Sequence, residues 1–451
     1  MRAGVAAGHP ATAAAGLEIL ADGGTAADAA VAACLASCVA ETVMTGLLGG
    51  GHALWWDGRE TRLLDCFVTV PTRLGEMEQL PVPFGEEIVH YAIGPASCGV
   101  PGVPLGLDAL WRLGGRLPWR RLCEPALRLA REGVVLPEAH AACLAMLSPV
   151  MTLGRGAELY APGGRLLGDG ETLRQPGLEA ALEALAEEGA GSCYSGSLAE
   201  ALLAVEGVAV TRDDLGSYEV RWEEPVTAQH DGYALWTRGG LSGVPELFAR
   251  LPKLCDLPEA ERVLAFLAAL EAEPPGPDGH TTNLVTVDAE GGCCVLTTSL
   301  GLGSGDFLPG LDLHLNSMLG EADLVVGPLV PGERMASMMA PTLAFDGNGP
   351  LLAIGSAGGT RLRGALVGVA AGILDEGLEP QAAVDRPRFH PADGVVNAEP
   401  GVDEEALARL EANGRAVRRW PSRHHYFGGV SLVGRDGPAA DPRRSGAAVA
   451  L

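Results

Sequence analysis

The sequence predicts an α+β fold in which strands form pairs and helices lie between and after them. Two hairpin patterns, at residues 281–299 and 341–354, place apolar runs on either side of Gly-containing turns. Alanine-rich amphipathic stretches predict helices. Hydrophobic residues make up 47% and charged residues 20% of the 451 positions, which is typical of a folded globular protein. This length accommodates two or three average domains or one large α/β unit.

The charge distribution argues against nucleic acid as a partner. The formal net charge is −25, and Lys253 is the only lysine. The arginine pairs at 120–121, 418–419 and 443–444 are isolated and form no basic patch. Because an acidic surface repels phosphates and anionic lipid heads, we expect neither nucleic-acid nor membrane partners.

The N-terminal residues Met1–Pro10 carry one positive charge and no apolar segment. The sequence therefore predicts no secretory signal and a cytoplasmic protein. The longest uncharged helical run, Ala29–Ala40, is too short to span a bilayer, and its alanine content indicates a buried helix.

The ten cysteines are scattered through helical and strand-like stretches, and adjacent Cys293 and Cys294 would point to opposite faces of a strand. This pattern indicates reduced core residues rather than disulfides. A zinc site needs closely spaced pairs such as C-x-x-C, which Cys34 and Cys38 do not form. We therefore expect no metal site and no cofactor.

In the N-terminal half, helices alternate with short strands. The helix His9–Gly24 ends at two glycines, and Thr25–Asp28 opens the next helix with a capping-box pattern. The glycine cluster 46–51 precedes a strand at 53–56 but lacks the other parts of a phosphate-binding loop, so we interpret it as close backbone packing. Further helices are expected at 101–133, 177–188, 197–205 and 259–272, and strands at 219–222 and 233–236.

The composition changes sharply at 273–279, where three prolines and two glycines predict an exposed, flexible linker. The two hairpins follow, with strands at 281–287, 293–299, 341–345 and 351–354. The expected elements after them are helices at 363–374 and 404–412 and a final strand at 430–433.

Thr281 stands at the mouth of the first hairpin and is the candidate nucleophile. A hydroxyl attacks poorly until a base takes its proton, and the α-amino group of the same threonine becomes that base once the His280–Thr281 bond is cut. The ordinary pKa of such an amine, about 7.7, leaves much of it unprotonated near neutral pH. The alternative is a threonine that only begins a strand.

Gly358-Gly359 lead from a predicted strand into a predicted helix. A turn of this kind presents free backbone N–H groups at the helix start, where they stabilise developing negative charge. The alternative is a tight packing turn between strand and helix.

A series of short motifs runs along the chain: His9-Pro10, Gly23 to Ala29, Gly46 to Gly51, Val100-Pro101-Gly102, Pro125-Ala126, Tyr194-Ser195-Gly196, Thr281-Thr282, Pro341-Thr342, Gly355 to Arg361, Pro387 to His390 and Asp441 to Gly446. Each motif alone is weak. In this order, covering nearly the whole chain, they resemble the γ-glutamyltransferase family of N-terminal nucleophile (Ntn) hydrolases.

The resemblance implies a four-layer αββα sandwich made as one precursor that cuts itself before a threonine. Here the cut would fall between His280 and Thr281, giving a large segment, 1–280, and a small segment, 281–451, intertwined in one structural domain. The hydroxyl of Thr281 would attack the preceding carbonyl, and water would open the resulting ester. The product would be a hydrolase or acyltransferase for a small molecule, needing no cofactor, whose two fragments are each other's partners.

The resemblance also implies roles around Thr281. Ser299 matches a hydroxyl that supports the freed amine, with serine where threonine is common; an ordinary strand serine is the alternative. Gly358 and Gly359 match the oxyanion pair, and losing one such donor raises the barrier by roughly 3 to 4 kcal/mol. Three charged residues are either accessories or members of structural ion pairs: Arg334, Arg361 and Asp441.

The positions that bind glutamate in this family have changed. Glu76 stands in place of the arginine for the substrate carboxylate, which Arg73 could replace if the loop shifts. Glu321 stands for the aspartate that holds the amino group, and of two adjacent serines only Ser337 is kept, because the second is Met338. A substrate carboxylate about 4 Å from an arginine has an interaction energy of about −4 kcal/mol. At the same distance from a glutamate, the interaction energy is about +4 kcal/mol.

Three functions therefore remain open. The first is hydrolysis or transfer of a γ-glutamyl group. The second uses the same nucleophile on another substrate, through amide or carbon–carbon bond cleavage in specialised metabolism. The third is an unprocessed binding protein without catalysis.

Overall fold

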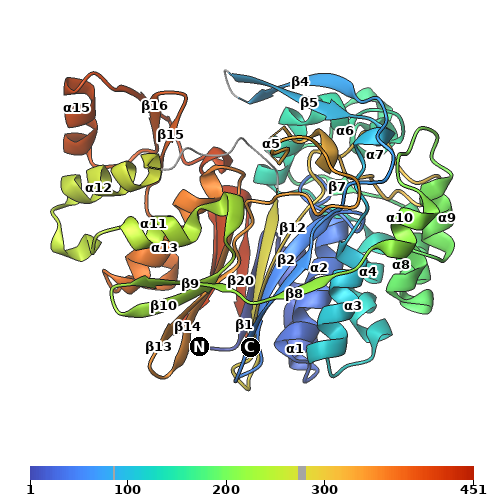
Figure 1. The fold of residues 1–451 in the computed structure, drawn as a ribbon, viewed down its shortest axis with the longest axis horizontal. Coiled ribbons are helices and arrows are strands. Elements are labelled where there is room, and N and C mark those ends of the chain that lie inside the picture. Colours follow the sequence, from blue (N-terminus) through green and yellow to red (C-terminus); the bar gives the residue numbers. More distant parts are fainter. Residues whose placement is uncertain (85–86, 273–280, 323) are drawn as a thin grey trace.

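Two antiparallel sheets pack face to face at the centre of the molecule, and helices cover the outer face of each (Figure 1). The computed structural model describes residues 1–84, 87–272, 281–322 and 324–451. The seven-stranded sheet has the order β20 (Ala447–Ala450), β1 (Gly4–Ala7), β11 (Thr282–Val287), β12 (Cys293–Ser299), β2 (Gly50–Trp56), β3 (Thr61–Cys66) and β8 (Arg221–Glu223). The six-stranded sheet has the order β19 (Gly437–Ala440), β18 (Gly429–Gly434), β14 (Gly349–Ala357), β13 (Thr342–Asp346), β10 (Tyr233–Thr237) and β9 (Val226–His230).

Helices α1 (Pro10–Ala21) and α2 (Ala26–Ala40) lie on the seven-stranded sheet. All of α2 is buried, because its small side chains allow it to pack at once on the sheet, on α1 and on α4 (Trp119–Glu132). The predicted capping box is confirmed: the Thr25 hydroxyl accepts from the Asp28 N–H, and the Asp28 carboxylate accepts from the Thr25 N–H. Helices α11 (Val244–Arg250) and α13 (Arg361–Leu374) cover the six-stranded sheet.

The other elements surround this centre. The helices are α3 (Val103–Gly114), α5 (Glu138–Met146), α6 (Ser148–Met151), α7 (Arg155–Tyr160), α8 (Gly177–Glu188), α9 (Ser197–Leu203), α10 (Arg212–Ser217), α12 (Glu259–Glu271), α14 (Pro380–Asp385) and α15 (Glu404–Ala412). The strands are β4 (Glu78–Phe84), β5 (Glu87–Ile93), β6 (Val134–Val135), β7 (Thr172–Leu173), β15 (Phe389–Ala392), β16 (Val395–Ala398) and β17 (Ala416–Arg419). In Figure 1, α12, α15, β15 and β16 lie together beside the six-stranded sheet.

Both faces of the central hairpin β11–β12 are buried. Alternate residues of a strand point to opposite faces, so each strand contributes to two cores. Leu284 and Leu296 belong to the core that contains α2. Apolar side chains from both sheets fill the space between them: Leu54, Val285, Val295, Leu343, Ala353 and Val433.

The glycine cluster packs closely, as predicted; Gly46 and Gly49 precede strand β2, and Gly50 and Gly51 are its first two residues. A Cβ on Gly51 would stand 2.5 Å from the Thr297 carbonyl oxygen, and a Cβ on Gly49 would stand 2.1 Å from that of Ser299. At Gly50, where strand β2 begins, a Cβ would stand 2.7 Å from the Val68 nitrogen, so the neighbouring chain leaves room only for glycine.

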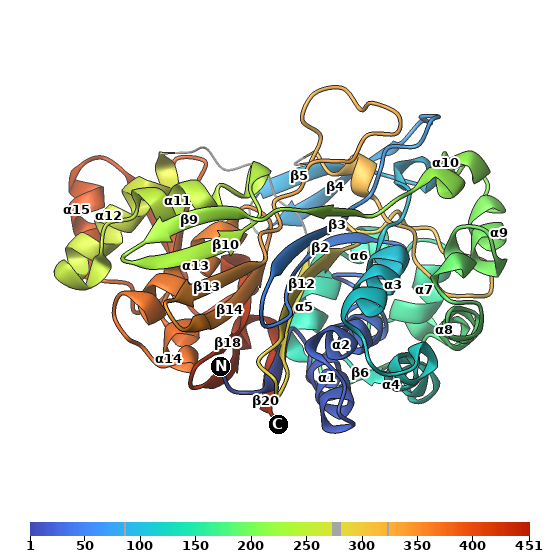
Figure 2. The same cartoon turned by 60° about the horizontal axis from the view of Figure 1, so that its bottom comes forward.

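The two predicted hairpins are confirmed as β11–β12 and β13–β14. The expectation that 430–433 is the final strand is wrong, because β19 and β20 follow it. Strand β20 pairs with β1, so the two ends of the chain lie side by side (Figures 1 and 2). Both are short and rich in small residues, and neither alternates clearly enough to predict a strand. The predicted linker 273–279 and His280 lie outside the described residues.

Within the described ranges, no helix has both the length and the apolar character needed to cross a membrane. Those ranges also contain no group of three or more His, Cys, Asp or Glu side chains that could hold a metal ion. The ten cysteines are free thiols; all are buried except Cys255, which is partly exposed.

Candidate functional site

Thr281 lies directly before β11 with only 6% of its surface exposed. It belongs to the walls of two small cavities, of about 340 and 320 Å³. The first, called the apolar pocket here, is lined by Phe67, Thr281, Ser299, Gly301, Met318, Glu321, Leu324, Ser337, Met338, Met339, Gly359 and Leu362. The second, called the polar pocket, includes Glu41, His140, Thr281, Thr282, Asn283, Asp441 and Arg444 in its lining.

The apolar pocket brings most of the predicted site residues together. Thr281 and Ser299 reach it from the open ends of neighbouring strands, since Thr282 pairs with Thr298 in the β11–β12 ladder. The Ser299 hydroxyl accepts a hydrogen bond of 3.0 Å from the Gly301 N–H, which helps to fix its position. The remaining predicted residues in the lining are Glu321, Ser337, Met338 and Gly359.

Gly358 and Gly359 form the turn between β14 and α13, at φ angles of 131° and 57°. The Arg361 and Leu362 N–H groups donate 3.1 Å bonds to the Gly358 and Gly359 carbonyls and close the first turn of the helix. A Cβ on Gly358 would stand 2.7 Å from the Cα of Gly428, so both the backbone angle and the neighbouring chain require glycine.

Glu321 is the one carboxylate among the described residues that line the apolar pocket, and it is 1% exposed. Its Oε1 accepts from the Leu302 N–H at 2.9 Å and from the Ser317 hydroxyl at 3.1 Å, while Oε2 has no hydrogen-bond partner among the described residues. Burial raises the pKa of Glu321 to about 7, against the effect of these two bonds.

Arg73 and Glu76 are exposed and lie between the strand-like Thr69–Val70 segment and β4. Neither lines the pockets at Thr281. No arginine or lysine is found among the described residues that line the apolar pocket. The wall consists mainly of apolar side chains, with Met338 in place of a second serine next to Ser337.

The sequence analysis missed Glu41, which is 1% exposed in the polar pocket. Its two oxygens accept from the Thr12 hydroxyl at 2.6 Å and from the Thr282 hydroxyl at 2.5 Å. Burial raises the pKa of Glu41 to about 7, although these bonds and the nearby Arg444 oppose the shift. The available signal was its position as the lone charge ending the uncharged run 29–40.

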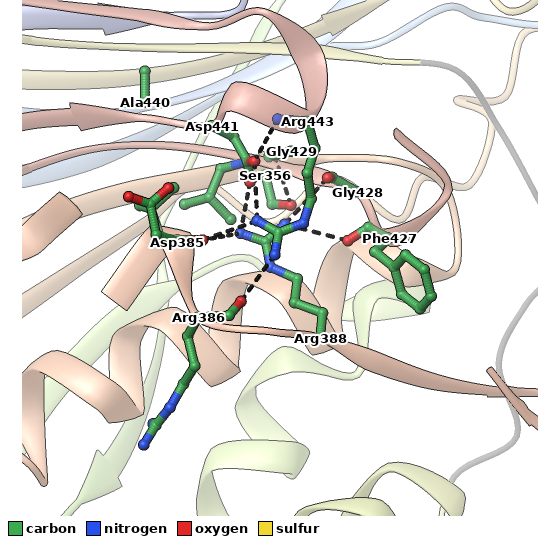
Figure 3. A network of polar contacts seen from close by, with 12 residues as sticks. Ser356, Asp385, Arg386, Arg388, Phe427, Gly428, Gly429, Ala440, Asp441 and Arg443 are labelled. Carbon is green, nitrogen blue, oxygen red and sulfur yellow. Dashed lines mark hydrogen bonds and ion pairs between the residues drawn. The ribbon is translucent and has the colours of Figure 1, made fainter. Parts of the chain in front are cut away.

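A buried ion network is centred on Arg388, Asp441 and Arg443 (Figure 3). Arg388 forms an ion pair of 2.6 Å with Asp441 and donates to the carbonyl oxygens of Phe427 and Gly428. Gly428 is the residue against which Gly358 packs. Arg443 forms ion pairs with Asp441 at 3.3 Å and with Glu399 at 2.5 Å. The predicted ion-pair alternative for Asp441 therefore matches its observed contacts.

Arg361 and Arg334 donate hydrogen bonds to backbone carbonyls, and Arg334 also forms an ion pair with Asp65, with Nε 3.5 Å from Oδ1. Arg361 donates from Nε to the Tyr426 carbonyl and lies over the Tyr426 ring. Arg334 donates to the carbonyl oxygens of Phe67 and Glu219, which ties Phe67, in the lining of the apolar pocket, to the 219 segment.

Comparisons with known proteins place this geometry in a family. The sequence matches the family model for gamma-glutamyltranspeptidase over residues 12–254 and 258–451. The Acylase ACY 1 proenzyme of Pseudomonas sp. (strain V22) is 27% identical over 509 residues, covering 95% of this chain and 89% of the relative. The glutathione hydrolase proenzyme of Bacillus subtilis (strain 168) is 23% identical over 538 residues, covering 99% and 91%.

Among solved structures, cephalosporin acylase from Bacillus halodurans matches with a TM-score of 0.85 at 25% identity, covering 100% of this chain and 96% of that chain. The similarity thus extends over the whole mixed helix-and-sheet fold. Because the family model covers nearly all of the sequence, the chain belongs to the gamma-glutamyltranspeptidase family and is a hydrolase or acyltransferase of that type.

Proposed function

We propose that this protein is a self-cleaving threonine hydrolase of the Ntn type, with Thr281 as its nucleophile. The observation that carries the proposal is the apolar pocket, in which Thr281, Ser299 and the glycine turn at the start of α13 meet. The two helix-covered sheets would be the αββα sandwich of such enzymes, divided by the cut into segments 1–280 and 281–451. The proenzyme names of two relatives support processing.

In the proposed maturation, the Thr281 hydroxyl attacks the carbonyl of residue 280 and the peptide nitrogen leaves as the α-amine of Thr281. The resulting ester is opened by water, which releases the carboxylate of residue 280 and restores the hydroxyl. The new amine is now the base for the same hydroxyl, with an ordinary pKa near 7.7. Ser299, at the end of the neighbouring strand, supports this amine.

In the proposed turnover, the amine takes the hydroxyl proton while the Thr281 oxygen attacks the substrate carbonyl. The oxyanion that forms is stabilised by N–H groups of the Gly358–Gly359 turn, where the helix dipole of α13 adds positive potential. The proton passes to the leaving amine, and water or another acceptor then opens the acyl ester. No metal or cofactor takes part in this scheme.

The lining of the apolar pocket favours an acyl group other than γ-glutamyl. A free substrate carboxylate would find apolar side chains and the Glu321 carboxylate there, and burying such a charge without a cationic partner is costly. Glu321 Oε2 instead suits an amine or amide N–H on a largely apolar acyl group. Two of the relatives are named acylases, which supports this choice. The second candidate, γ-glutamyl hydrolysis, is favoured by the family and by the glutathione hydrolase relative.

Two experiments test the proposal. Intact mass of the purified protein should show two fragments that separate at residues 280 and 281, whereas the Thr281→Ala variant should stay whole. A wild-type chain that remains unbroken after prolonged incubation would indicate the unprocessed binding protein. Hydrolysis of a γ-glutamyl anilide is then compared with hydrolysis of anilides of apolar amino acids, which distinguishes the two substrate classes. The rate with the Thr281→Ala variant serves as the background.

A further inference from the structure

A larger cavity lies away from Thr281, between α12, α13 and the β15 segment. Its volume, counted as far as its opening to solvent, is about 880 Å³. It is called the α13 cavity here. None of the described residues that line it also lines either pocket at Thr281. It is therefore a separate feature of the molecule.

The wall formed by α13 contains two helical glycines that the protein's own packing does not require. A Cβ on Gly364 would come no closer than 3.5 Å to Leu270, and a Cβ on Gly368 no closer than 3.5 Å to Phe266. Both distances are ordinary contacts, although each glycine costs a helix interior about 1 kcal/mol relative to alanine. Their effect is to leave room in a cavity that also has Phe266, Phe389 and Phe427 in its lining.

A buried histidine belongs to the lining of the same cavity. His390 lines it with 3% of its surface exposed, and its Nε2 has no hydrogen-bond partner among the described residues. Burial, together with the positive Arg361 and Arg363, lowers the pKa of His390 to about 3. The ring is therefore neutral near pH 7, and its Nε2 can act as a hydrogen-bond donor or acceptor according to the tautomer.

The charges around the cavity favour an anion. Four arginines line it, against the carboxylates of Glu259 and Asp403. The carboxylates that pair with these arginines lie outside the lining, because Arg262 and Arg386 bind Glu376, and Arg388 binds Asp441. Glu376 and Asp441 are not part of the lining, whose described charged residues are four arginines and two carboxylates. The four arginines are Arg262, Arg361, Arg386 and Arg388.

We propose that the α13 cavity binds a small organic carboxylate with an apolar ring or chain. Its carboxylate lies near Arg361 and accepts a hydrogen bond from His390 Nε2, and its apolar part lies against Gly364 and Gly368. The charge complementarity and the apolar wall together select this class over neutral or cationic molecules.

The position of the cavity links such a ligand to the Gly358 turn. Arg361 follows Gly359 by two residues, and Phe427 precedes Gly428, against which Gly358 packs. A bound carboxylate thus contacts chain segments on both sides of the turn. That it changes the rate of the Thr281 reaction rests on the proposed function; that it binds does not.

Calorimetry on the full-length protein tests binding without any need for activity. Phenylacetate and hexanoate are the probes, with phenylacetamide and benzylamine as neutral and cationic counterparts. We expect at least one carboxylate to bind more tightly than about 10 mM, and phenylacetamide and benzylamine to bind at least threefold more weakly than phenylacetate. Thr281→Ala should bind the carboxylates as the wild type does, which separates this site from the proposed catalytic one.

A matched pair of variants locates the binding. Gly368→Ala fits the space at 3.5 Å and should keep the affinity, whereas Gly368→Leu fills the cavity and should weaken binding at least tenfold. Thermal unfolding shows that both variants are folded, and if Gly368→Leu is not, Ala365→Leu on the same wall replaces it. Absence of carboxylate binding to the wild type, equal binding by the filled variant, or tighter binding of benzylamine would each overturn the proposal.

Discussion

The two pockets that meet at Thr281 each contain one buried glutamate whose pKa is about 7, yet the two side chains are bonded differently. Both oxygens of Glu41 accept hydrogen bonds from threonine hydroxyls. In Glu321, Oε1 accepts two bonds and Oε2 none within the described part of the chain. A raised pKa alone therefore does not identify a ligand-binding group. The oxygen without a partner is the further observation on which we propose that Glu321 binds substrate, whereas Glu41, with both oxygens bonded, holds the strand of Thr281.

The largest expected effect comes from the residue that both pockets share. Thr281→Ala removes the hydroxyl that would attack both the chain and the substrate, so we expect no self-cleavage and no turnover. Intact mass and an anilide assay measure both losses. Thr282→Ser keeps the hydroxyl bonded to Glu41 and should still cleave, and cleavage in Thr281→Ala would remove Thr281 from its proposed role.

The second largest effect is expected from the Gly358–Gly359 turn, which is changed without altering the pocket side chains. Gly358→Ala forces an alanine into φ near 131° with its Cβ 2.7 Å from Gly428, which displaces the proposed oxyanion donors. We expect kcat to fall roughly 100- to 1,000-fold, measured on the cleaved fraction. Gly347→Ala is the control, because a Cβ there meets nothing within 4 Å. A normal kcat in Gly358→Ala would contradict the oxyanion assignment.

The comparison of the two glutamates is tested directly by Glu321→Gln and Glu41→Gln. Replacing Glu321 removes the charge that would attract a substrate amine, so KM for amine-bearing acyl donors should rise about tenfold, with a smaller change in kcat. Glu41→Gln should leave KM unchanged, because both oxygens of Glu41 are already bonded within the protein. Equal KM values for wild type and Glu321→Gln would refute the assignment of Glu321.

The smallest effect is on stability. Each glutamate has an ordinary pKa of 4.5 and a folded pKa of about 7, so between these values the folded protein keeps a proton that the unfolded chain releases. Stability therefore falls as pH rises from 4.5 to 7 and then levels off, by at most about 3 kcal/mol for each group. Denaturant titrations should show a flatter profile in the double glutamine variant. An unchanged slope would mean that neither glutamate retains its proton.

Short-range patterns made much of this site predictable. The hairpin that positions Thr281 and Ser299 and the strand–Gly–Gly–helix turn are each defined by neighbouring residues, and both lie where the sequence indicates. Glu41 was not predictable because its contact with Thr282 joins residues 241 positions apart. The pairing of β1 with β20 and the Arg388–Asp441 ion pair likewise depend on distant partners.

The lining of the apolar pocket was less predictable than the position of Thr281, for a related reason. Alignment of Arg73 and Glu76 with binding positions depends on loop conformation, and the structure places both in an exposed segment away from Thr281. The roles predicted for these two residues remain to be tested. Ser337 and Met338, in contrast, do line the apolar pocket. Their segment is held there because Met338 packs in one cluster with Phe67 and Met318.

The strand order gives the proposed cut a further meaning. Strands from before residue 280 and after residue 281 pair at three places in the seven-stranded sheet, where β1 lies between β20 and β11, and β12 pairs with β2. The six-stranded sheet joins the two segments once more, through β10 and β13. Two separate chains could not be pulled apart without opening both sheets. Thr281, Ser299 and the Gly358–Gly359 turn come together only after these strands have paired. Cleavage would therefore occur only in correctly folded molecules, and the broken bond would record that folding permanently.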